Sequence, residues 1–303
     1  MRGDVEKAME IIQRDPQALD HALELLQNTV FSFSMKVCGH REDAEDTMQD
    51  VLLKTVPNLP RFDNSKALVV WLYRVAKNRC LMSRRRSKFA PKEHLSLDDL
   101  MPDAVEIESL TSGEHHSPEL SVLKAEQAEK LRETIHQIPA QYRLILVLHD
   151  MEELSTSEIA EVTGLTEANV RVRLHRARLY LRKQLATSAA GVHEPETLKT
   201  DSKRRRRSTR HIHSHAGESA LSCKQMFAKL SDYLDEALDP SLCDKLEQHM
   251  AECKPCEAFL ATLKATVEQT RQIPEHATAP AVAAEVRRKL LSQLQQAFAV
   301  MKG

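Results

Sequence analysis

Three side chains of the types that bind metals stand close together in the run His-Met-Ala-Glu-Cys-Lys-Pro-Cys at 249–256. His249 and Cys253 are four residues apart, so on a helix they share one face. Cys253 and Cys256 enclose two residues, which is the loop spacing that lets two thiolates reach one ion. Cys223, which begins the module, completes a Cys₃His set that leaves no open coordination position. The pattern therefore predicts one structural Zn²⁺.

Two alternatives stay open for this cluster. Cys243 competes with Cys223 as the fourth ligand, and the thiols could also be buried or free, because a CxxC pair alone is a weak signal. The other two cysteines, Cys38 and Cys80, lie far apart in the first half of the chain, and we expect them to be core residues. Without an apolar secretion core at the N-terminus, clustered cysteines favour a reducing, cytoplasmic setting and a metal over disulfides.

The composition indicates the elements that must position these residues. At 303 residues the chain suits two or three domains, and its 7 glycines and 4% aromatic residues favour an all-α protein rich in helix formers. A stretch of 18 consecutive apolar residues is missing, so we expect no membrane span. The net charge of -1 conceals basic clusters at 79–88, 171–183 and 203–210, and local basic blocks matter more for polyanion binding than the total.

Apolar periodicity and its interruptions divide the chain into six predicted segments. The segments are a helical domain at 1–88, a flexible linker at 89–118, a second helical domain at 119–187, a basic flexible linker at 188–221, a small helical cysteine-bearing domain at 222–270 and a C-terminal amphipathic helix at 271–303.

The second helical domain contains a predicted helix-turn-helix centred on Gly164. Ser155 or Thr156 can cap the first helix, with Glu158 near the capping-box position, and Gly164 supplies the turn. The exposed face of the second helix carries Asn169, Arg171, Arg173 and Arg176. Arginine reads guanine edges and asparagine reads adenine, and both hold phosphates. A solvated basic face is the alternative, but the turn, the caps and the charges together favour DNA binding.

The first helical domain combines an acidic patch, a basic end and the single tryptophan of the chain. The acidic patch is Glu42, Asp43, Glu45, Asp46 and Asp50, and the basic end is Arg79, Arg84, Arg85, Arg86 and Lys88. Trp71 beside basic residues can stack on an unpaired base while the cations hold the nucleic-acid backbone. A core tryptophan with a solvated charge run is the alternative.

These motifs resemble the extracytoplasmic-function (ECF) sigma factors, over about 1–88, 119–187 and 222–260. ANVRVRLHRARLYLRK is similar to the terminal helix of their promoter-reading domain. EDAEDTMQDVLLKTV resembles the helix that docks on the polymerase clamp, and FDNSKALVVWLYRVAKNRCLMSRRR resembles the helix pair that melts and reads the minus-ten element.

The resemblance implies three sets of site residues. The set facing the minus-thirty-five element is Glu167, Asn169, Arg171, Arg173 and Arg176, with His175 expected to contact backbone or solvent. The set at the melted minus-ten strand is Asn64, Lys66, Trp71, Arg74, Asn78 and Arg79. The set facing the polymerase is Asp43, Glu45, Asp46 and Gln49. The stretch at 67–70 departs from the polar loop of the family by being more apolar.

The segment SCKQMFAKLSDYLDEALDPSLCDKLEQHMAECKPCEAFL resembles the zinc-binding anti-sigma domain, which docks between the sigma domains and occludes polymerase. In one chain it implies regulation in cis, either inhibitory or needed for activity, and a tether strengthens even weak docking. Its acidic residues could face basic sigma surfaces or simply be solvated. They are Asp232, Asp235, Glu236 and Asp239.

The resemblance thus predicts a cytoplasmic sigma factor that binds core RNA polymerase and promoter DNA, with no membrane partner and no enzymatic activity. A helix-turn-helix regulator acting without polymerase is the alternative, although it would need neither the acidic helix nor the tryptophan-bearing helix. A metal-dependent enzyme is disfavoured by the closed four-ligand site and by the lack of a Gly-rich phosphate loop or an acid–base pair.

Overall fold

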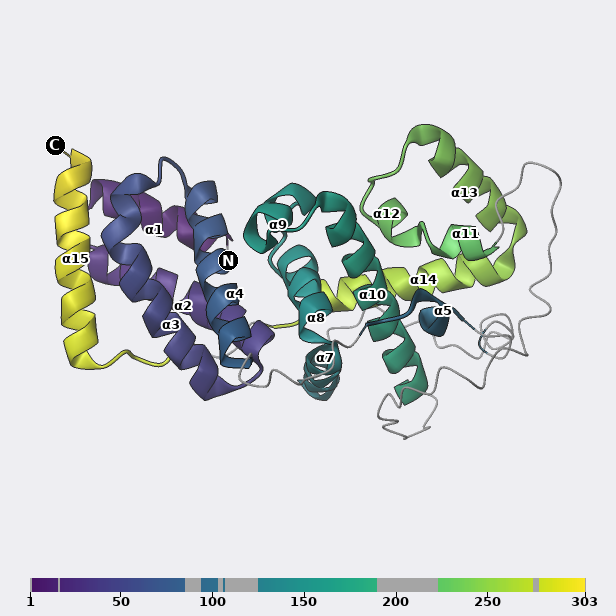
Figure 1. Cartoon of the computed structure of the whole chain (residues 1–303), viewed down its shortest axis with the longest axis horizontal. Coiled ribbons are helices and arrows are strands. Elements are labelled where there is room, and N and C mark those ends of the chain that lie inside the picture. The colour runs from purple at the N-terminus through teal and green to yellow at the C-terminus, as the bar shows by residue number, and fades with distance from the viewer. Residues whose placement is uncertain are drawn as a thin grey trace. The chain divides into compact units, whose positions relative to one another are not determined.

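The computed structural model describes residues 2–15, 17–84, 94–102, 106, 125–189, 223–274 and 278–302. These residues form helices and turns without any strand, which confirms the predicted all-α class (Figure 1). Among them, no helix combines the length and apolar character that a membrane crossing requires.

The elements follow one another in chain order as short and medium-length helices. They are α1 (Arg2–Arg14), α2 (Leu19–Cys38), α3 (Arg41–Thr55), the 3₁₀ helix η1 (Val56–Arg61), α4 (Ser65–Arg84), α5 (Leu97–Leu100), α7 (Ala125–Gln137), α8 (Ala140–Leu146), the π-helical turn η2 (Val147–Met151), α9 (Thr156–Thr163), α10 (Glu167–Ala189), α11 (Cys223–Phe227), α12 (Leu230–Leu234), α13 (Pro240–Glu252), α14 (Lys254–Arg271) and α15 (Ala284–Lys302).

Contacts between residues divide the chain into two compact units. The first unit comprises residues 1–93, 139–170 and 273–303, and the second comprises 94–138 and 171–272. Helix α10 therefore begins in the first unit and continues in the second, and the C-terminal helix belongs with the N-terminal helices. Most of the two predicted linkers lies outside the described residues. The exceptions are 94–102 and 106 in the linker predicted at 89–118, and 188–189, which end α10, in the linker predicted at 188–221.

The core of the first unit is built around α2, which packs against α1, α3 and α4. Helix α2 ends at Gly39, whose positive φ of 81° lets its N–H reach the carbonyl of Met35. Helix α15 lies along α1, α2 and η1 (Figure 1). Its buried residues Leu290, Leu294 and Ala297 recur every three or four positions, as an amphipathic helix requires.

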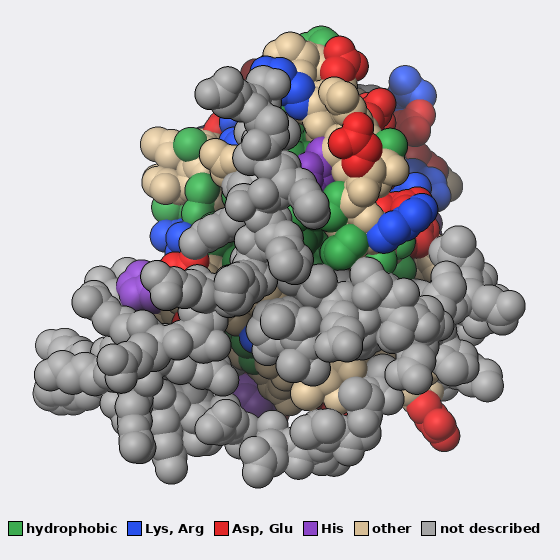
Figure 2. Space-filling view, turned by 90° about the vertical axis from the view of Figure 1, so that its right-hand side faces the viewer, with side chains coloured by type: hydrophobic (Ala, Val, Ile, Leu, Met, Phe, Trp, Pro, Cys, Tyr) green, Lys and Arg blue, Asp and Glu red, His purple; other side chains and the backbone are tan. Residues whose placement is uncertain are grey.

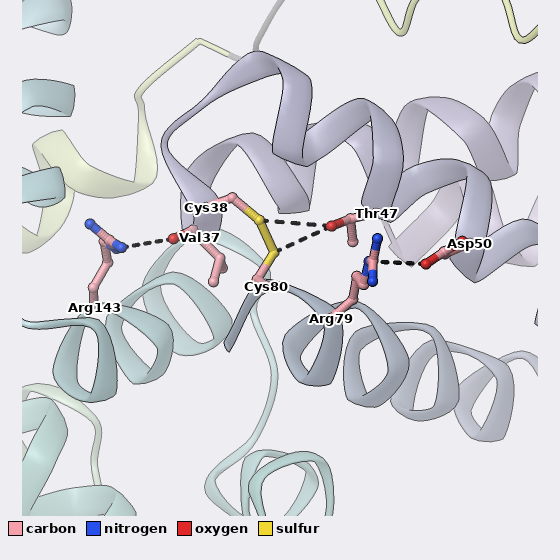
Figure 3. The surroundings of a disulfide bond; sticks show 7 residues. All are labelled: Val37, Cys38, Thr47, Asp50, Arg79, Cys80 and Arg143. Atoms are coloured by element: carbon pink, nitrogen blue, oxygen red, sulfur yellow. Dashed lines mark hydrogen bonds and ion pairs between the residues drawn. A yellow bond between two sulfur atoms is a disulfide. The ribbon is translucent and has the colours of Figure 1, made fainter. Parts of the chain in front are cut away.

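A disulfide joins α2 to α4 in this unit. Cys38, the last residue of α2, is bonded to Cys80 of α4, with 5.4 Å between their Cα atoms and Thr47 beside both sulfur atoms (Figure 3). Both cysteines are buried, as expected for core residues, but the sequence reasoning did not anticipate that they are bonded to each other. The bond forms because α2 and α4 pack directly together, which a separation of 42 residues in sequence does not reveal.

The second unit surrounds an aromatic pair. Phe227 and Phe259 lie 4.5 Å apart between ring centroids, and both are fully buried between α11 and α14. Helix α13 begins at an N-cap, Asp239, whose carboxylate accepts the N–H of Leu242, and Pro240 occupies the first helical position. On the face in Figure 2, acidic, basic and apolar side chains are interspersed over the part that is not grey. That part of the surface therefore does not form one continuous basic patch.

Candidate nucleic-acid interface and metal centre

Four potential metal ligands converge where α11, α13 and α14 meet. Cys223 begins α11, His249 lies in the last turn of α13, Cys253 joins α13 to α14, and Cys256 lies in the first turn of α14. Their ligand atoms all lie within 4.8 Å of one another. Cys253 can hold this place because it ends one helix, its N–H bonding the carbonyl of His249, and starts the next.

The distances within the group fit a tetrahedral ion. Zinc–sulfur bonds of about 2.3 Å and zinc–nitrogen bonds of about 2.0 Å place two sulfur ligands roughly 3.8 Å apart and a sulfur and a nitrogen roughly 3.5 Å apart. The Sγ atom of Cys223 lies 3.9 Å from Sγ of Cys253 and 3.6 Å from Nε2 of His249. Nε2 of His249 lies 3.2 Å from Sγ of Cys256. The donor set and its spacing therefore suit Zn²⁺ without rearrangement of the helices.

The ionisation of the thiols also calls for a cation. The hydrogen bond from Cys256 lowers the pKa of Cys223 to about 5, with His249 and Cys253 adding to the effect against the cost of burial. The interaction with Cys223 and burial together raise the pKa of Cys256 above its usual range. Crowded thiols thus share protons, whereas a bound divalent cation would favour all three thiolates at once.

Cys243 does not join this group. It lies half-buried on α13 as a free cysteine, outside the set of four atoms that converge. The geometry therefore favours Cys223 as the fourth candidate ligand.

The helix-turn-helix is built by α9, a turn at Gly164 and α10. The Ser155 side chain accepts the N–H of Glu158, and the Glu158 carboxylate accepts the N–H of Ser155, which forms a complete capping box. Gly164 has a φ of 74°, and its N–H donates to the carbonyl of Ala160. Because glycine has no Cβ, it adopts this left-handed conformation and ends α9 without steric strain. Thr166 then accepts the N–H of Asn169 at the start of α10.

The five residues expected to face the major groove all lie on α10 with some exposure. Glu167, Asn169 and Arg171 are exposed, whereas Arg173 and Arg176 are half-buried. Helix α10 thus offers the amide and guanidinium groups that base and phosphate contacts require.

His175 departs from its expected contact with backbone or solvent. Its side chain is buried at 7% exposure, and neither ring nitrogen has a hydrogen-bond partner in the described part of the chain. Burial, together with the neighbouring charges of Arg178, Arg176 and Lys229, lowers the pKa of His175 to about 4. The reason is its helical position, which points away from the exposed side of α10 toward the cysteine-bearing domain.

Two buried arginines of α10 were missed by sequence reasoning. Arg178 is fully buried and binds Asp235 through both of its terminal nitrogens, at 2.7 and 2.8 Å, and donates to Ser231 Oγ at 2.8 Å. Asp235, one of the four acidic residues singled out in the sequence, therefore contacts a basic residue of α10. A helical-wheel projection of α10 could have separated these positions from the exposed arginines.

Arg182 makes the second buried contact of α10. Its guanidinium stacks 3.7 Å from the ring centroid of Phe259, donates to Thr262 Oγ1 at 2.7 Å and pairs with Glu106. Burial lowers the pKa of Arg182, and Glu106 partly opposes that shift. The C-terminal half of α10 is thereby attached to the cysteine-bearing domain.

Three of the six residues expected at the minus-ten strand lie together. Trp71, Asn78 and Arg79 of α4 line a surface cavity of about 610 Å³ that is completed by α3 and η1, including Lys54 and Asn58. Phe62 stands 5.8 Å from the Trp71 ring. An aromatic ring, an amide and cations around one cavity are the groups that hold an unstacked base.

The other three residues of that set have partners inside the first unit. The Asn64 side chain accepts the N–H of Ala67 and thereby caps α4. Lys66 lies 3.5 Å from the carboxylate of Glu158, and Arg74 donates to the carbonyl of Glu161 at 2.6 Å. The structure therefore does not gather all six residues on one free surface.

The four acidic and amide residues expected to face the polymerase lie on α3. Its inner face is buried through Ala44, Met48, Val51 and Leu52. Asp46 is exposed on the outer side, where it stands with three half-buried residues: Asp43, Glu45 and Gln49. Glu45 also pairs with Arg41 at 2.7 Å one turn earlier.

Comparisons with known proteins account for both helical regions and for the cysteine cluster. Residues 23–89 match the family described as Sigma-70 region 2, residues 128–181 match Sigma-70, region 4, and residues 223–256 match a family described as "Putative zinc-finger".

Curated relatives agree with these family matches. The chain is 26% identical over 180 residues to the ECF RNA polymerase sigma factor SigW of Bacillus subtilis, covering 59% of this chain and 95% of that protein. It is 28% identical over 159 residues to the RNA polymerase sigma factor YlaC of the same species, covering 52% of this chain and 87% of YlaC. It is 28% identical over 189 residues to the RNA polymerase sigma-H factor of Pseudomonas aeruginosa, covering 59% of this chain and 93% of that protein.

The chain thus contains both Sigma-70 regions, 2 and 4, on an all-α framework. It is similar to ECF RNA polymerase sigma factors and has a further segment after region 4 that matches a zinc-finger family.

Proposed function

We propose that this protein binds core RNA polymerase and directs it to a promoter, reading a minus-ten element with α4 and a minus-thirty-five element with α10. The observation that carries this proposal is the presence, in one chain, of both sigma regions with reading side chains at a cavity and on an exposed recognition helix. Because polymerase acts in the cytoplasm, we place the protein there.

In region 2, strand capture follows from the cavity beside Trp71. Unstacking a base costs a few kcal/mol, and stacking on the indole ring together with hydrogen bonds from Asn78 and Arg79 offsets that cost. Arg79 pairs with Asp50 at 2.9 Å, and since both side chains are partly exposed, a phosphate can replace that carboxylate at low cost. This function requires no covalent chemistry by the chain.

In region 4, the exposed start of α10 enters the major groove. Asn169, Arg171 and Arg173 would contact base edges and phosphates, and the capping box and Gly164 set where α9 begins and ends before α10 starts. Asp43, Asp46 and Gln49 on α3 form the surface that we assign to the polymerase.

Zn²⁺ is the cation that we assign to Cys223, His249, Cys253 and Cys256. Bound there, it would supply a structural cross-link among three helices, because four protein ligands leave no position for a substrate or water. The ligand spacing supports this assignment, and a structural role agrees with a function that needs no metal chemistry.

We further propose that the cysteine-bearing domain inhibits region 4 in cis. Its residues Asp235 and Phe259 engage Arg178 and Arg182 of α10. Arg171, one of the groove-facing residues, lies close enough to influence the pKa of Asp232. Contacts that occupy one side of the recognition helix hinder its entry into a groove about 12 Å wide. Inhibition is therefore the better supported of the two forms of regulation.

Run-off transcription with core polymerase tests this proposal. We expect initiation from a cognate promoter by the full-length chain and several-fold more by a chain truncated after Ala190. Replacing Arg171 and Arg173 together by Ala in the truncated chain should abolish most of that signal, since each base contact is worth about 1–3 kcal/mol.

The same assay separates the competing functions. A regulator that acts without polymerase would bind DNA but leave core polymerase unable to initiate, and a chain that never associates with the core enzyme would contradict the proposal. Equal activity of the full-length and truncated chains would contradict the inhibitory role alone.

A further inference from the structure

An exposed aliphatic side chain stands in the middle of the face of α10 that carries the polar residues assigned to the groove. Val172 is 48% exposed, and in the part of the chain that the structure describes the one other exposed large hydrophobic residue is Val300, near the end of α15. By contrast, Val170, Leu174 and Leu181 of α10 are at most 2% exposed. Val172 therefore lies on a side of α10 that the protein's own core does not cover.

Helical spacing surrounds Val172 with groups that can contact DNA. Residues three and four positions apart are neighbours on one face of an α-helix. Asn169 lies three positions before Val172, and Arg176 lies four positions after it. Ala168, which is also exposed, lies one turn before Val172 on the same face. The centre of this face is thus aliphatic, whereas an amide and a guanidinium stand on either side of it along the helix.

An exposed valine at this position has two costs that the free protein does not offset. Its β-branched side chain is restricted in a helix, so valine has a lower helix propensity than alanine, arginine or lysine. Its apolar surface also stays in water, which is unfavourable in proportion to the exposed area. Single exposed apolar residues are common on protein surfaces, but Val172 stands among side chains that suit base edges and phosphates. A partner with apolar surface at this point would remove the second cost.

The major groove of DNA offers one such apolar group on its base edges. Thymine presents its C5-methyl group there, whereas guanine, adenine and cytosine present hydrogen-bond acceptors and donors. The side chain of Val172 has neither a donor nor an acceptor, so it can pack against the methyl group without losing a hydrogen bond. Against the N4 amino group of cytosine, the same side chain would displace water from a donor and offer no partner in return. Contact with Val172 therefore favours thymine over cytosine.

We propose that Val172 reads the methyl group of a thymine in the minus-thirty-five element, between the base pairs contacted by Asn169 and Arg176. This inference rests on the proposed function and deepens it, because it names a base and the residue that selects it. Val172 is not among the five residues that the resemblance places at the groove. Since asparagine pairs bidentately with adenine, the thymine should lie close to an A·T pair read by Asn169.

Selection of DNA by the complex of core polymerase with the full-length chain supplies the probe. Duplexes randomised across both promoter elements are incubated with this complex, and the fragments that stay bound are sequenced. Each thymine of the recovered upstream element is then replaced by deoxyuridine, which removes the methyl group and keeps every hydrogen-bonding group. At one thymine, this replacement should weaken binding about four-fold, which corresponds to the burial of one methyl-sized group.

Substitutions of Val172 connect that loss to this side chain. Val172→Ala should bind the thymine and deoxyuridine duplexes equally, because the shorter side chain does not reach the methyl group. The position is exposed and alanine is the better helix former, so this variant should fold. Val172→Thr keeps one of the two branch methyl groups and should retain part of the loss. Val300→Ala is the matched control: it shortens the other exposed valine and should show the full loss.

The outcomes separate this inference from the proposed function. A loss at the same thymine that persists in Val172→Ala would overturn the role of Val172, as would a recovered element in which no thymine responds to removal of its methyl group. A chain that selects a sequence only in the absence of polymerase would defeat the proposed function, and the same duplexes would still decide the role of Val172. A chain that selects no sequence with or without polymerase would overturn both.

Discussion

The metal cluster shows how much a few side chains can specify at the scale of single residues. His249, Cys253 and Cys256 are brought together by helical periodicity and a two-residue loop, which are local features that sequence reasoning can evaluate. Cys223 is 26 residues from His249, and only the packing of α11 against α14 brings it to the same point.

Removing one ligand should release the metal and loosen the second unit. We expect Cys253→Ser to lower zinc content from one equivalent per chain to near zero, measured by atomic absorption, and to increase proteolysis of α11–α14, since structural zinc contributes directly to folding. Cys243→Ser is the control and should retain one equivalent. Zinc loss in the Cys243 variant alone would assign the fourth ligand differently.

His175 should make the second unit sensitive to acid. Its folded-state pKa of about 4 lies below the unfolded value of 6.5, so its contribution is fully present above pH 6.5 and is lost as the pH falls toward 4. The loss between pH 7.5 and pH 5 should be about 2 kcal/mol, with about 3 kcal/mol as the upper limit.

Urea unfolding at the two pH values measures this effect. His175→Leu should lose less stability than the wild type on acidification, because both forms share every other titrating group, including the cysteines. The acidic neighbours Asp232 and Asp235 and the cations Arg178 and Lys229 remain in both proteins. An identical loss in the two proteins would contradict a buried neutral imidazole.

At the scale of elements, α10 presents an exposed basic side and a buried side that contacts the cysteine-bearing domain. The exposed side of the helix and its basic character could be predicted from the sequence, together with the turn at Gly164 and the capping box that positions it. A helical wheel places Arg178 and Arg182 on the buried side of α10, but it does not reveal which groups pair with them. Their partners, Asp235 and Phe259, lie more than 50 residues away in the chain.

The disulfide between α2 and α4 should stabilise the first unit. Closing a loop of about 42 residues removes conformational freedom from the unfolded chain, which corresponds to roughly 2–4 kcal/mol. Reduction with dithiothreitol should therefore lower the urea midpoint followed by fluorescence of Trp71, the single tryptophan and a residue of α4.

Replacing both Cys38 and Cys80 by Ala provides the comparison. That variant should unfold at the lower midpoint of the reduced wild type and should not respond to dithiothreitol. Cys243→Ala should behave as the wild type. A wild-type midpoint that ignores the reductant would mean that the two thiols are not bonded in solution.

At the scale of the whole molecule, the packing of helices that are distant in the sequence was the hardest feature to predict. Periodicity predicted helices over most of the described residues, and motif spacing located both DNA-reading regions. It could not indicate that α15 packs on α1, α2 and η1, or that residues 139–170 pack with region 2, because tertiary contacts between amphipathic helices leave no local signature. The buried ion pair between Lys36 and Glu152 was missed for the same reason, since the two residues are 116 positions apart in the sequence.

The attachment of Arg178 and Arg182 to Asp235, Glu106 and Phe259 also bears on how ionic strength acts on this protein. An arginine whose guanidinium is already paired within its own chain does not neutralise a DNA phosphate, so it releases no condensed counterions from the DNA. If both arginines turn to phosphates after truncation at Ala190, a plot of log affinity against log salt concentration should become steeper by up to about 1.8. Titration of a duplex promoter fragment at several potassium chloride concentrations would measure that slope, and equal slopes for the two chains would mean that these arginines never reach the duplex.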